Sequence, residues 1–113
     1  EKPFTIVGDG EQTRDFTYVE NVVQANVRAF FAPDTAVNKV YNIAYGDRIS
    51  LNTLWSDLQD ISQIELEANY GATRNGDIKD SLANISKAKN LLEYDPLFSA
   101  KEGMKVTWKI FCR

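Results

Sequence analysis

The chain has 113 residues, of which 43% are hydrophobic, 12% aromatic and 26% charged. This length fits one domain, residues 1–113, and the aromatic content excludes a disordered chain. Thirteen Lys and Arg against 16 Asp and Glu give a charge of -3, and without a basic run we expect no nucleic-acid partner. The apolar runs are too short for a membrane-spanning helix, so we expect no membrane partner either.

The first third of the chain predicts two short strands and one helix. Residues 4–7 are a β-prone run that ends at a Gly8-Asp9-Gly10 turn, and residues 14–19 alternate polar and aromatic side chains. A helix is predicted to begin at Val19 or Glu20 and to stop before Pro33. One face of this helix is apolar: Val19, Val22, Val23, Val27, Phe30 and Phe31.

The middle of the chain predicts further strands and a second helix. Residues 39–44 are a β-prone run, and residues 65–70 alternate weakly. Ser50 is a good N-cap for a helix. The apolar face of that helix comprises Leu51, Leu54, Trp55, Leu58 and Ile61.

The last third predicts a loop and two helices. Residues 71–81 have turn composition, centred on Asn75-Gly76. Asn84 or Ser86 is expected to cap a short helix that ends before Pro96. Ser99 to Glu102 reads as a capping box that opens the last helix. Four helices with three or four short strands predict an α+β fold, with too few strands for a self-sufficient sheet.

Several kinds of site are excluded by missing residue types. Without histidine, neither a Ser-His-Asp or Cys-His catalytic site nor a tetrahedral zinc site can form, and we predict no metal site. The single Cys112 is expected to be a reduced, partly packed thiol. Gly8-Asp9-Gly10 is interpreted as a tight turn and not as a dinucleotide loop. Thr13 stands where such a loop has its third glycine, and the predicted element that follows is a strand instead of a helix.

Three separated segments together resemble one known family. They are IVGDG through RDFTYV in residues 6–19, VYNIA in residues 40–44, and RNGDI through SLANISKA in residues 74–88. In order and spacing they resemble the C-terminal substrate-binding lobe of extended short-chain dehydrogenase/reductases that act on nucleotide sugars. Within that family the likeness is greatest to UDP-N-acetylglucosamine 4-epimerases, and it spans essentially the whole chain.

The resemblance implies four substrate-binding residues. Arg14 and Arg74 would contact the diphosphate, Asp77 the ribose, and Ser81 would line the sugar pocket, where a small residue leaves room for an N-acetyl group. Guanidinium groups suit phosphate oxygens, and a carboxylate accepts hydrogen bonds from hydroxyls. From the sequence alone, simpler roles for these residues remain open. Arg14 could form a surface pair with Asp15, Arg74 and Asp77 could be a solvated loop pair, and Ser81 could be a loop hydroxyl or a helix cap. Asp15 is expected to hold nearby backbone.

The resemblance also implies a larger enzyme. The family's catalytic Tyr, four residues before a Lys, is absent, and so is its glycine-rich cofactor loop. We therefore expect this chain to be an inactive C-terminal portion without catalytic or cofactor-binding residues, whose partners are a UDP-sugar and a missing Rossmann lobe that binds NAD. The implied reaction is C4 inversion by transient oxidation, in the cytoplasm and in polysaccharide biosynthesis.

Two departures and two alternatives accompany this interpretation. Glu93 stands where the family has a Gly that ends the third helix, and Asn84 replaces an Asp. The first alternative is a sister enzyme, either a UDP-glucose 4-epimerase or a dehydratase or decarboxylase. The second is a non-catalytic domain that binds protein partners through its apolar faces.

Overall fold

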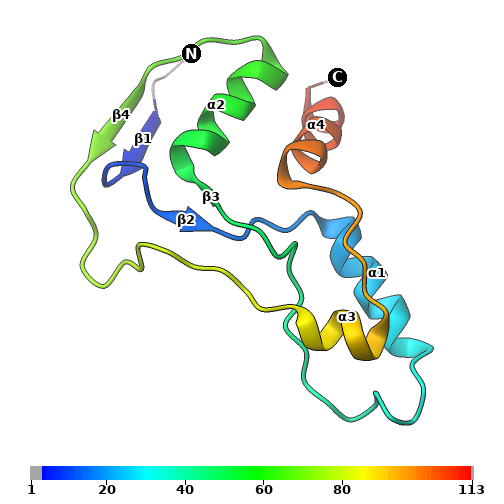
Figure 1. Cartoon of the computed structure of the whole chain (residues 1–113). Coiled ribbons are helices and arrows are strands. Elements are labelled where there is room, and N and C mark those ends of the chain that lie inside the picture. Colours follow the sequence, from blue (N-terminus) through cyan, green and yellow to red (C-terminus); the bar gives the residue numbers. More distant parts are fainter. Residues whose placement is uncertain (1–3, 113) are drawn as a thin grey trace.

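Helices and short strands alternate irregularly along the chain, as an α+β fold predicts (Figure 1). The structure is a computed structural model that describes residues 4–112. Its described elements are β1 (Phe4–Val7), β2 (Thr13–Arg14), α1 (Val19–Phe30), β3 (Ile49–Ser50), α2 (Leu51–Ser62), β4 (Ala68–Gly71), α3 (Ser86–Leu92) and α4 (Ala100–Phe111).

The strands form two small pairs. β1 and β4 are parallel, with Phe4 opposite Ala68 and Val7 opposite Gly71, whereas β2 and β3 are antiparallel. On its other side Thr13 of β2 bonds the 79–81 segment, since its amide donates to Lys79 O at 2.7 Å and its carbonyl accepts from Ser81 N at 3.2 Å. β2 therefore lies between two stretches of chain that are distant in sequence.

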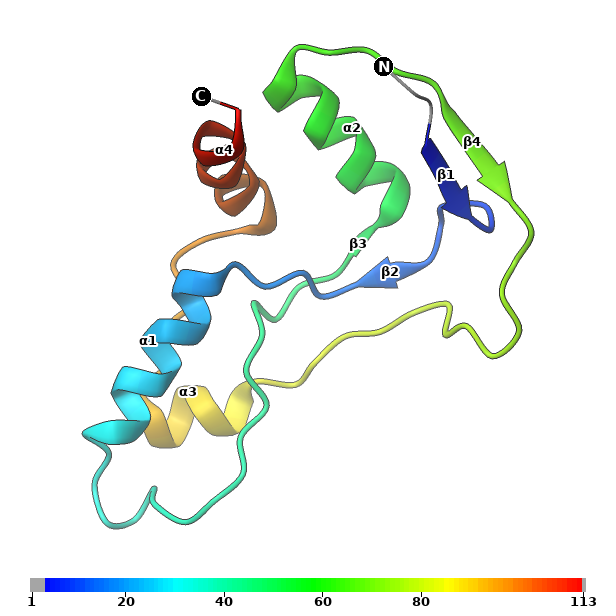
Figure 2. The same cartoon turned by 180° about the vertical axis from the view of Figure 1, so that it is seen from behind.

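The elements lie in two groups, which Figures 1 and 2 show from opposite sides. One group holds the β1–β4 pair with α2 and α4, and Lys101 links the two helices through Asp57 and Asp60 at 3.5 and 3.6 Å. The other holds α1 and α3, around a small buried core. That core comprises Ala25, Ala36, Ala44, Ile85, Ala88, Leu92 and Tyr94.

Local helix signals were predicted correctly at the start of α2 and of α4, but not at the start of α3. Ser50 caps α2 by accepting from Thr53 N, and Ser99 and Glu102 form the capping box of α4. Asn84 Oδ1 accepts from Ser86 N at 3.0 Å, although the residue at the N-cap position of α3 is Ile85. Glu93 ends α3 in the left-handed region, with φ 56°, despite its side chain.

The strand predictions were less accurate. The strand predicted over residues 14–19 is confined to Thr13–Arg14. Directly after it, the 45–46 loop is bonded to the Asp15 carboxylate and not to the backbone as a strand partner would be. Residues 39–44 form no strand, since they lie beside Lys87 and Tyr94 rather than beside another strand. The strand predicted over residues 65–70 is Ala68–Gly71, in the register set by β1.

The apolar face of α1 is not packed as its spacing predicts. Val23, Val27 and Phe30 are 53%, 51% and 83% exposed, whereas Asn21 and Ala25 are the buried residues of this helix. Cys112 is exposed rather than partly packed, because it follows the end of α4. Over residues 4–112 no helix is both long and apolar enough to cross a membrane.

Candidate nucleotide-binding cleft

A cleft of about 390 Å³ opens between β1, β2, the α2 helix and the loop that follows β4. Three of the four predicted site residues, Arg14, Arg74 and Asp77, line this cleft although they come from distant stretches of sequence. The complete lining is Thr5, Ile6, Val7, Gln12, Arg14, Leu51, Leu54, Trp55, Leu58, Arg74 and Asp77. The structure thus brings two cations and one carboxylate to a single concave surface.

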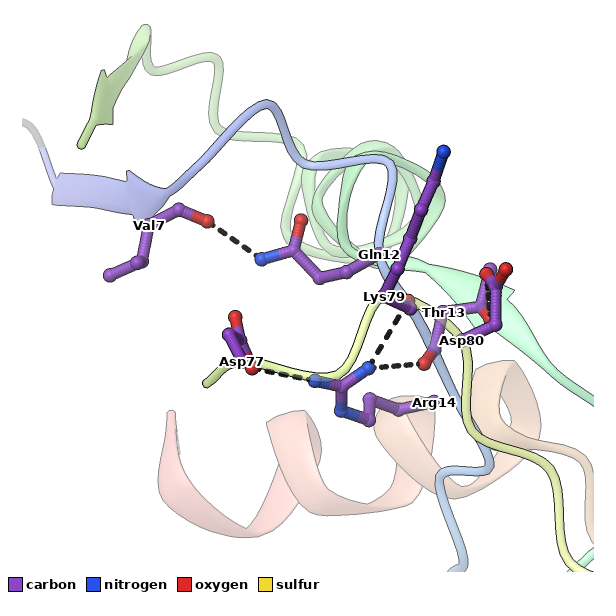
Figure 3. Close-up of polar contacts among 7 residues, drawn as sticks. All are labelled: Val7, Gln12, Thr13, Arg14, Asp77, Lys79 and Asp80. Atoms are coloured by element: carbon purple, nitrogen blue, oxygen red, sulfur yellow. Dashed lines mark hydrogen bonds and ion pairs between the residues drawn. The ribbon is translucent and has the colours of Figure 1, made fainter. Parts of the chain in front are cut away.

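Arg14 is held from three directions (Figure 3). Its Nη1 donates to Thr13 O at 2.6 Å and to Lys79 O at 3.3 Å, and its Nη2 pairs with Asp77 Oδ1 at 2.9 Å. The side chains of Arg14 and Asp77 are 30% and 28% exposed, so this ion pair is partly shielded from water. A guanidinium has five N–H donors, so three bonds leave it able to bind a further acceptor.

Arg74 and Asp77 stand at the two ends of one turn. The amide of Asp77 donates to Arg74 O at 3.2 Å, which closes a four-residue turn. Gly76 has φ +77°, and a Cβ atom there would meet nothing within 4 Å, so conformation and not space selects glycine. The predicted Asn75-Gly76 turn therefore presents both side chains to the cleft.

Gln12 is a cleft residue that sequence reasoning missed. It is 9% exposed, its side-chain Nε2 donates to Val7 O at 2.6 Å, and its backbone carbonyl accepts from Leu51 N at 3.2 Å. It therefore joins the end of β1 to the start of α2. A lone glutamine between a turn and a strand has no pattern that distinguishes it from a solvated residue.

The rest of the lining is largely apolar. Leu51, Leu54, Trp55 and Leu58 of α2 face the cleft together with Ile6 of β1. Of the predicted apolar face of α2, all residues except Ile61 therefore line the cleft. A site with one charged and one apolar part suits a ligand that carries both phosphate and a flat organic ring.

Asp15 has the structural role that the sequence analysis assigns to it. Its two carboxylate oxygens accept from Tyr45 N at 3.1 Å and Gly46 N at 3.0 Å. Nearby, Tyr94 OH donates to Ala44 O at 2.7 Å. Burial raises the pKa of Tyr94, and the negative charge of Asp15 adds to the effect. Because both Asp15 oxygens accept from the two backbone amides, Arg14 pairs with Asp77 and not with its neighbour Asp15.

Ser81 lies apart from the other three predicted residues. Its amide donates to Thr13 O at 3.2 Å, its side chain is exposed, and it is not part of the cleft lining. The expectation that it lines the sugar pocket comes from the family resemblance. Its role in sugar recognition remains a prediction.

Among residues 4–112 neither a loop of dinucleotide-binding form nor a cluster of three metal ligands is found. The Gly8–Gly10 turn leads into β2, whereas a dinucleotide loop leads into a helix whose N-terminus holds the pyrophosphate. Within residues 4–112 no three Cys, Asp or Glu side chains gather as metal ligands do.

Comparisons with known proteins point to one family. Residues 1–44 match the NAD dependent epimerase/dehydratase family. The chain is 36% identical to an uncharacterized UDP-glucose epimerase, YtcB of Bacillus subtilis, over 92% of the chain and 33% of that relative. The curated relatives it matches are thus about three times longer than the part that this chain spans.

Solved structures give the same result. The UDP-glucose 4-epimerase of Thermotoga maritima, solved with UDP-glucose, matches with a TM-score of 0.88 and 37% identity, over 97% of this chain and 35% of that one. A UDP-N-acetylglucosamine 4-epimerase of Methanobrevibacter ruminantium, solved with UDP-N-acetylmuramic acid, matches with a TM-score of 0.83 and 32% identity, over 99% of this chain and 36% of that one. The fold is that of the substrate-binding C-terminal region of such epimerases. The comparisons support a relationship to NAD-dependent nucleotide-sugar epimerases.

Proposed function

We propose that this chain forms the UDP-sugar-binding part of an NAD-dependent nucleotide-sugar 4-epimerase. The observation that carries the proposal is the convergence of Arg14, Arg74 and Asp77 on one cleft that also has an apolar wall. The structural relatives, solved with UDP-glucose or UDP-N-acetylmuramic acid, support the same ligand class.

In this proposal the two arginines bind the diphosphate. Charge-assisted hydrogen bonds from guanidinium to phosphate are shorter and stronger than neutral ones, and both arginines line the same cleft. Asp77 accepts from the ribose hydroxyls. Firm binding of the nucleotide orients the attached sugar, which lowers the entropy cost of the reaction at C4. In this proposal, residues outside this chain catalyse the reaction at C4 and bind the NAD that supplies the hydride transfer. The chain alone is therefore inactive.

A UDP titration of the whole protein tests this proposal. Arg14→Ala and Arg74→Ala are each expected to weaken UDP binding by about 10- to 100-fold, the range for a lost hydrogen bond to a charged group. Arg48→Ala is the matched control, because it removes the same charge at an exposed position outside the cleft lining. Circular dichroism checks that each variant is folded. Absent UDP binding, or binding that both cleft variants leave unchanged, would contradict the proposal and favour a protein-interaction domain.

We further propose that the sugar is N-acetylglucosamine and that the small Ser81 side chain leaves room for the acetyl group. The relative from Methanobrevibacter ruminantium supports this choice, while the UDP-glucose epimerases among the relatives support the alternative equally. Epimerisation of UDP-N-acetylglucosamine and UDP-glucose by the whole protein should therefore be compared side by side. Ser81→Tyr is expected to reduce activity on the acetylated sugar selectively, and an equal loss on both sugars would refute this assignment.

A further inference from the structure

The Asp77 carboxylate already pairs with Arg14, one of the two arginines that the proposed function assigns to the diphosphate. Asp77 Oδ1 lies 2.9 Å from Arg14 Nη2, and both side chains are about 70% buried. A bound diphosphate must share Arg14 with this carboxylate or displace it. In either case two like charges approach each other in a partly shielded cleft, where their repulsion is stronger than in bulk water.

The Asp77 carboxylate is expected to affect the binding of pyrophosphate and of a nucleoside diphosphate differently. Free pyrophosphate carries no hydroxyl group, so it meets the negative charge of Asp77 and offers nothing in return. A nucleoside diphosphate brings ribose hydroxyls that can donate to the same carboxylate. Asp77 therefore gains no new partner from pyrophosphate, whereas it gains hydroxyl partners from a nucleoside diphosphate.

We propose that Asp77 is a specificity-determining residue that makes the cleft select a nucleoside diphosphate over free pyrophosphate or phosphate. This inference rests on the proposed function and adds to it the discrimination between anions. Its physical basis is an arrangement that penalises the wrong ligand, in addition to contacts that favour the right one.

The fold keeps Asp77 at this position. The turn that its amide closes onto Arg74 O fixes the carboxylate beside the cleft, and Arg14 is itself anchored to the carbonyls of Thr13 and Lys79. The nearby Asp80 has a different partner, since its Oδ1 accepts from Thr13 Oγ1 at 2.8 Å (Figure 3). It does not line the cleft. The two acids thus form a natural pair for comparison.

Calorimetric titration of the whole protein with pyrophosphate and with UDP, in metal-free buffer at one ionic strength, tests the inference. Asp77→Asn is expected to tighten pyrophosphate binding about fivefold, the upper end for a partly exposed ion pair, and not to tighten UDP binding. The preference for UDP over pyrophosphate should therefore fall by at least that factor. Asp80→Asn removes the same charge three residues away and should leave the preference within about twofold of its original value.

The outcomes separate this inference from the proposed function. Suppose that UDP binds the unaltered protein. If Asp77→Asn then binds pyrophosphate no more tightly than the unaltered protein does, or if Asp80→Asn tightens pyrophosphate binding by the same factor, the inference is wrong and the proposed function stands. If UDP does not bind the unaltered protein, both fail. Should Asp77→Asn not fold, Asp77→Ser, another residue common in turns, gives the same test.

Discussion

Single side chains hold distant stretches of this chain together by bonding to their backbones. Asn21, 1% exposed, donates to Phe98 O at 2.7 Å and accepts from the amides of Leu97 and Phe98. Asp15 and Gln12 act in the same way on other segments. Because a buried polar group left without a partner costs about 1–3 kcal/mol, each of these bonds fixes the path of a loop as well as adding stability.

Glu93 gives a prediction at the scale of one residue. Its φ of 56° is a conformation in which glycine has an advantage of about 1 kcal/mol over other residues. Glu93→Gly is therefore expected to raise the free energy of unfolding by about 0.5–1 kcal/mol, measured by urea denaturation.

The matched control for that prediction is Glu93→Ala. Both variants remove the exposed contact of Glu93 with Arg28, which at 4.0 Å contributes little. Only glycine relieves the left-handed backbone. Equal unfolding free energies for the two variants would show that the backbone at this position is not the cause.

At the scale of elements, the start of α4 illustrates a self-contained signal. Glu102 Oε1 accepts from Ser99 N at 3.2 Å, and Ser99 Oγ accepts from Glu102 N at 3.2 Å. The hydrogen bond from the Ser99 amide, followed by that from its side chain, lowers the pKa of Glu102. The ionised carboxylate is therefore the form that the folded helix favours.

The expected consequence is a loss of stability in acid. A carboxyl group whose pKa is lower in the folded state stabilises the fold above its unfolded pKa, which is about 4.3, and this contribution disappears as pH falls through the folded pKa. Glu102→Gln keeps an acceptor for the Ser99 amide but cannot titrate. Urea denaturation between about pH 6 and pH 3 should show the two stabilities converging at low pH, whereas parallel curves would exclude the effect.

Element prediction succeeded where the signal is local. The caps at Ser50 and Ser99 and the turn at Asn75-Gly76 depend on neighbouring residues, and each occurs as the sequence indicates. A strand depends on its partner, so residues 39–44, which have strand-like composition, form none. For the same reason the two-residue β3, paired only with β2, was not predicted.

The candidate site was predictable in part and for a similar reason. Arg14, Arg74 and Asp77 were selected through a resemblance of motifs, and the fold brings them to one cleft. The pairing of Arg14 with Asp77 across the cleft, and the part played by Gln12, depend on how separate segments meet. No spacing within the sequence encodes those contacts.

At the scale of the whole molecule, the described chain is flat and open. It measures 51 × 38 × 15 Å with a radius of gyration of 16.8 Å, whereas a compact domain of this length has about 13 Å. Large apolar side chains stay exposed on α1 and α4, among them Phe30 at 83% and Phe111 at 82%. Exposed apolar faces of this kind mark surfaces that contact other protein, in accord with our proposal that the chain works within a larger enzyme.

The most direct test of the proposed function is a crystal structure of the whole protein with UDP. We expect the diphosphate to lie within hydrogen-bond distance of the Arg14 and Arg74 guanidinium groups, with the ribose hydroxyls on Asp77 and the uracil toward the apolar wall of the cleft. Electron density for UDP that lies away from this cleft, with neither arginine in contact with phosphate, would contradict the account.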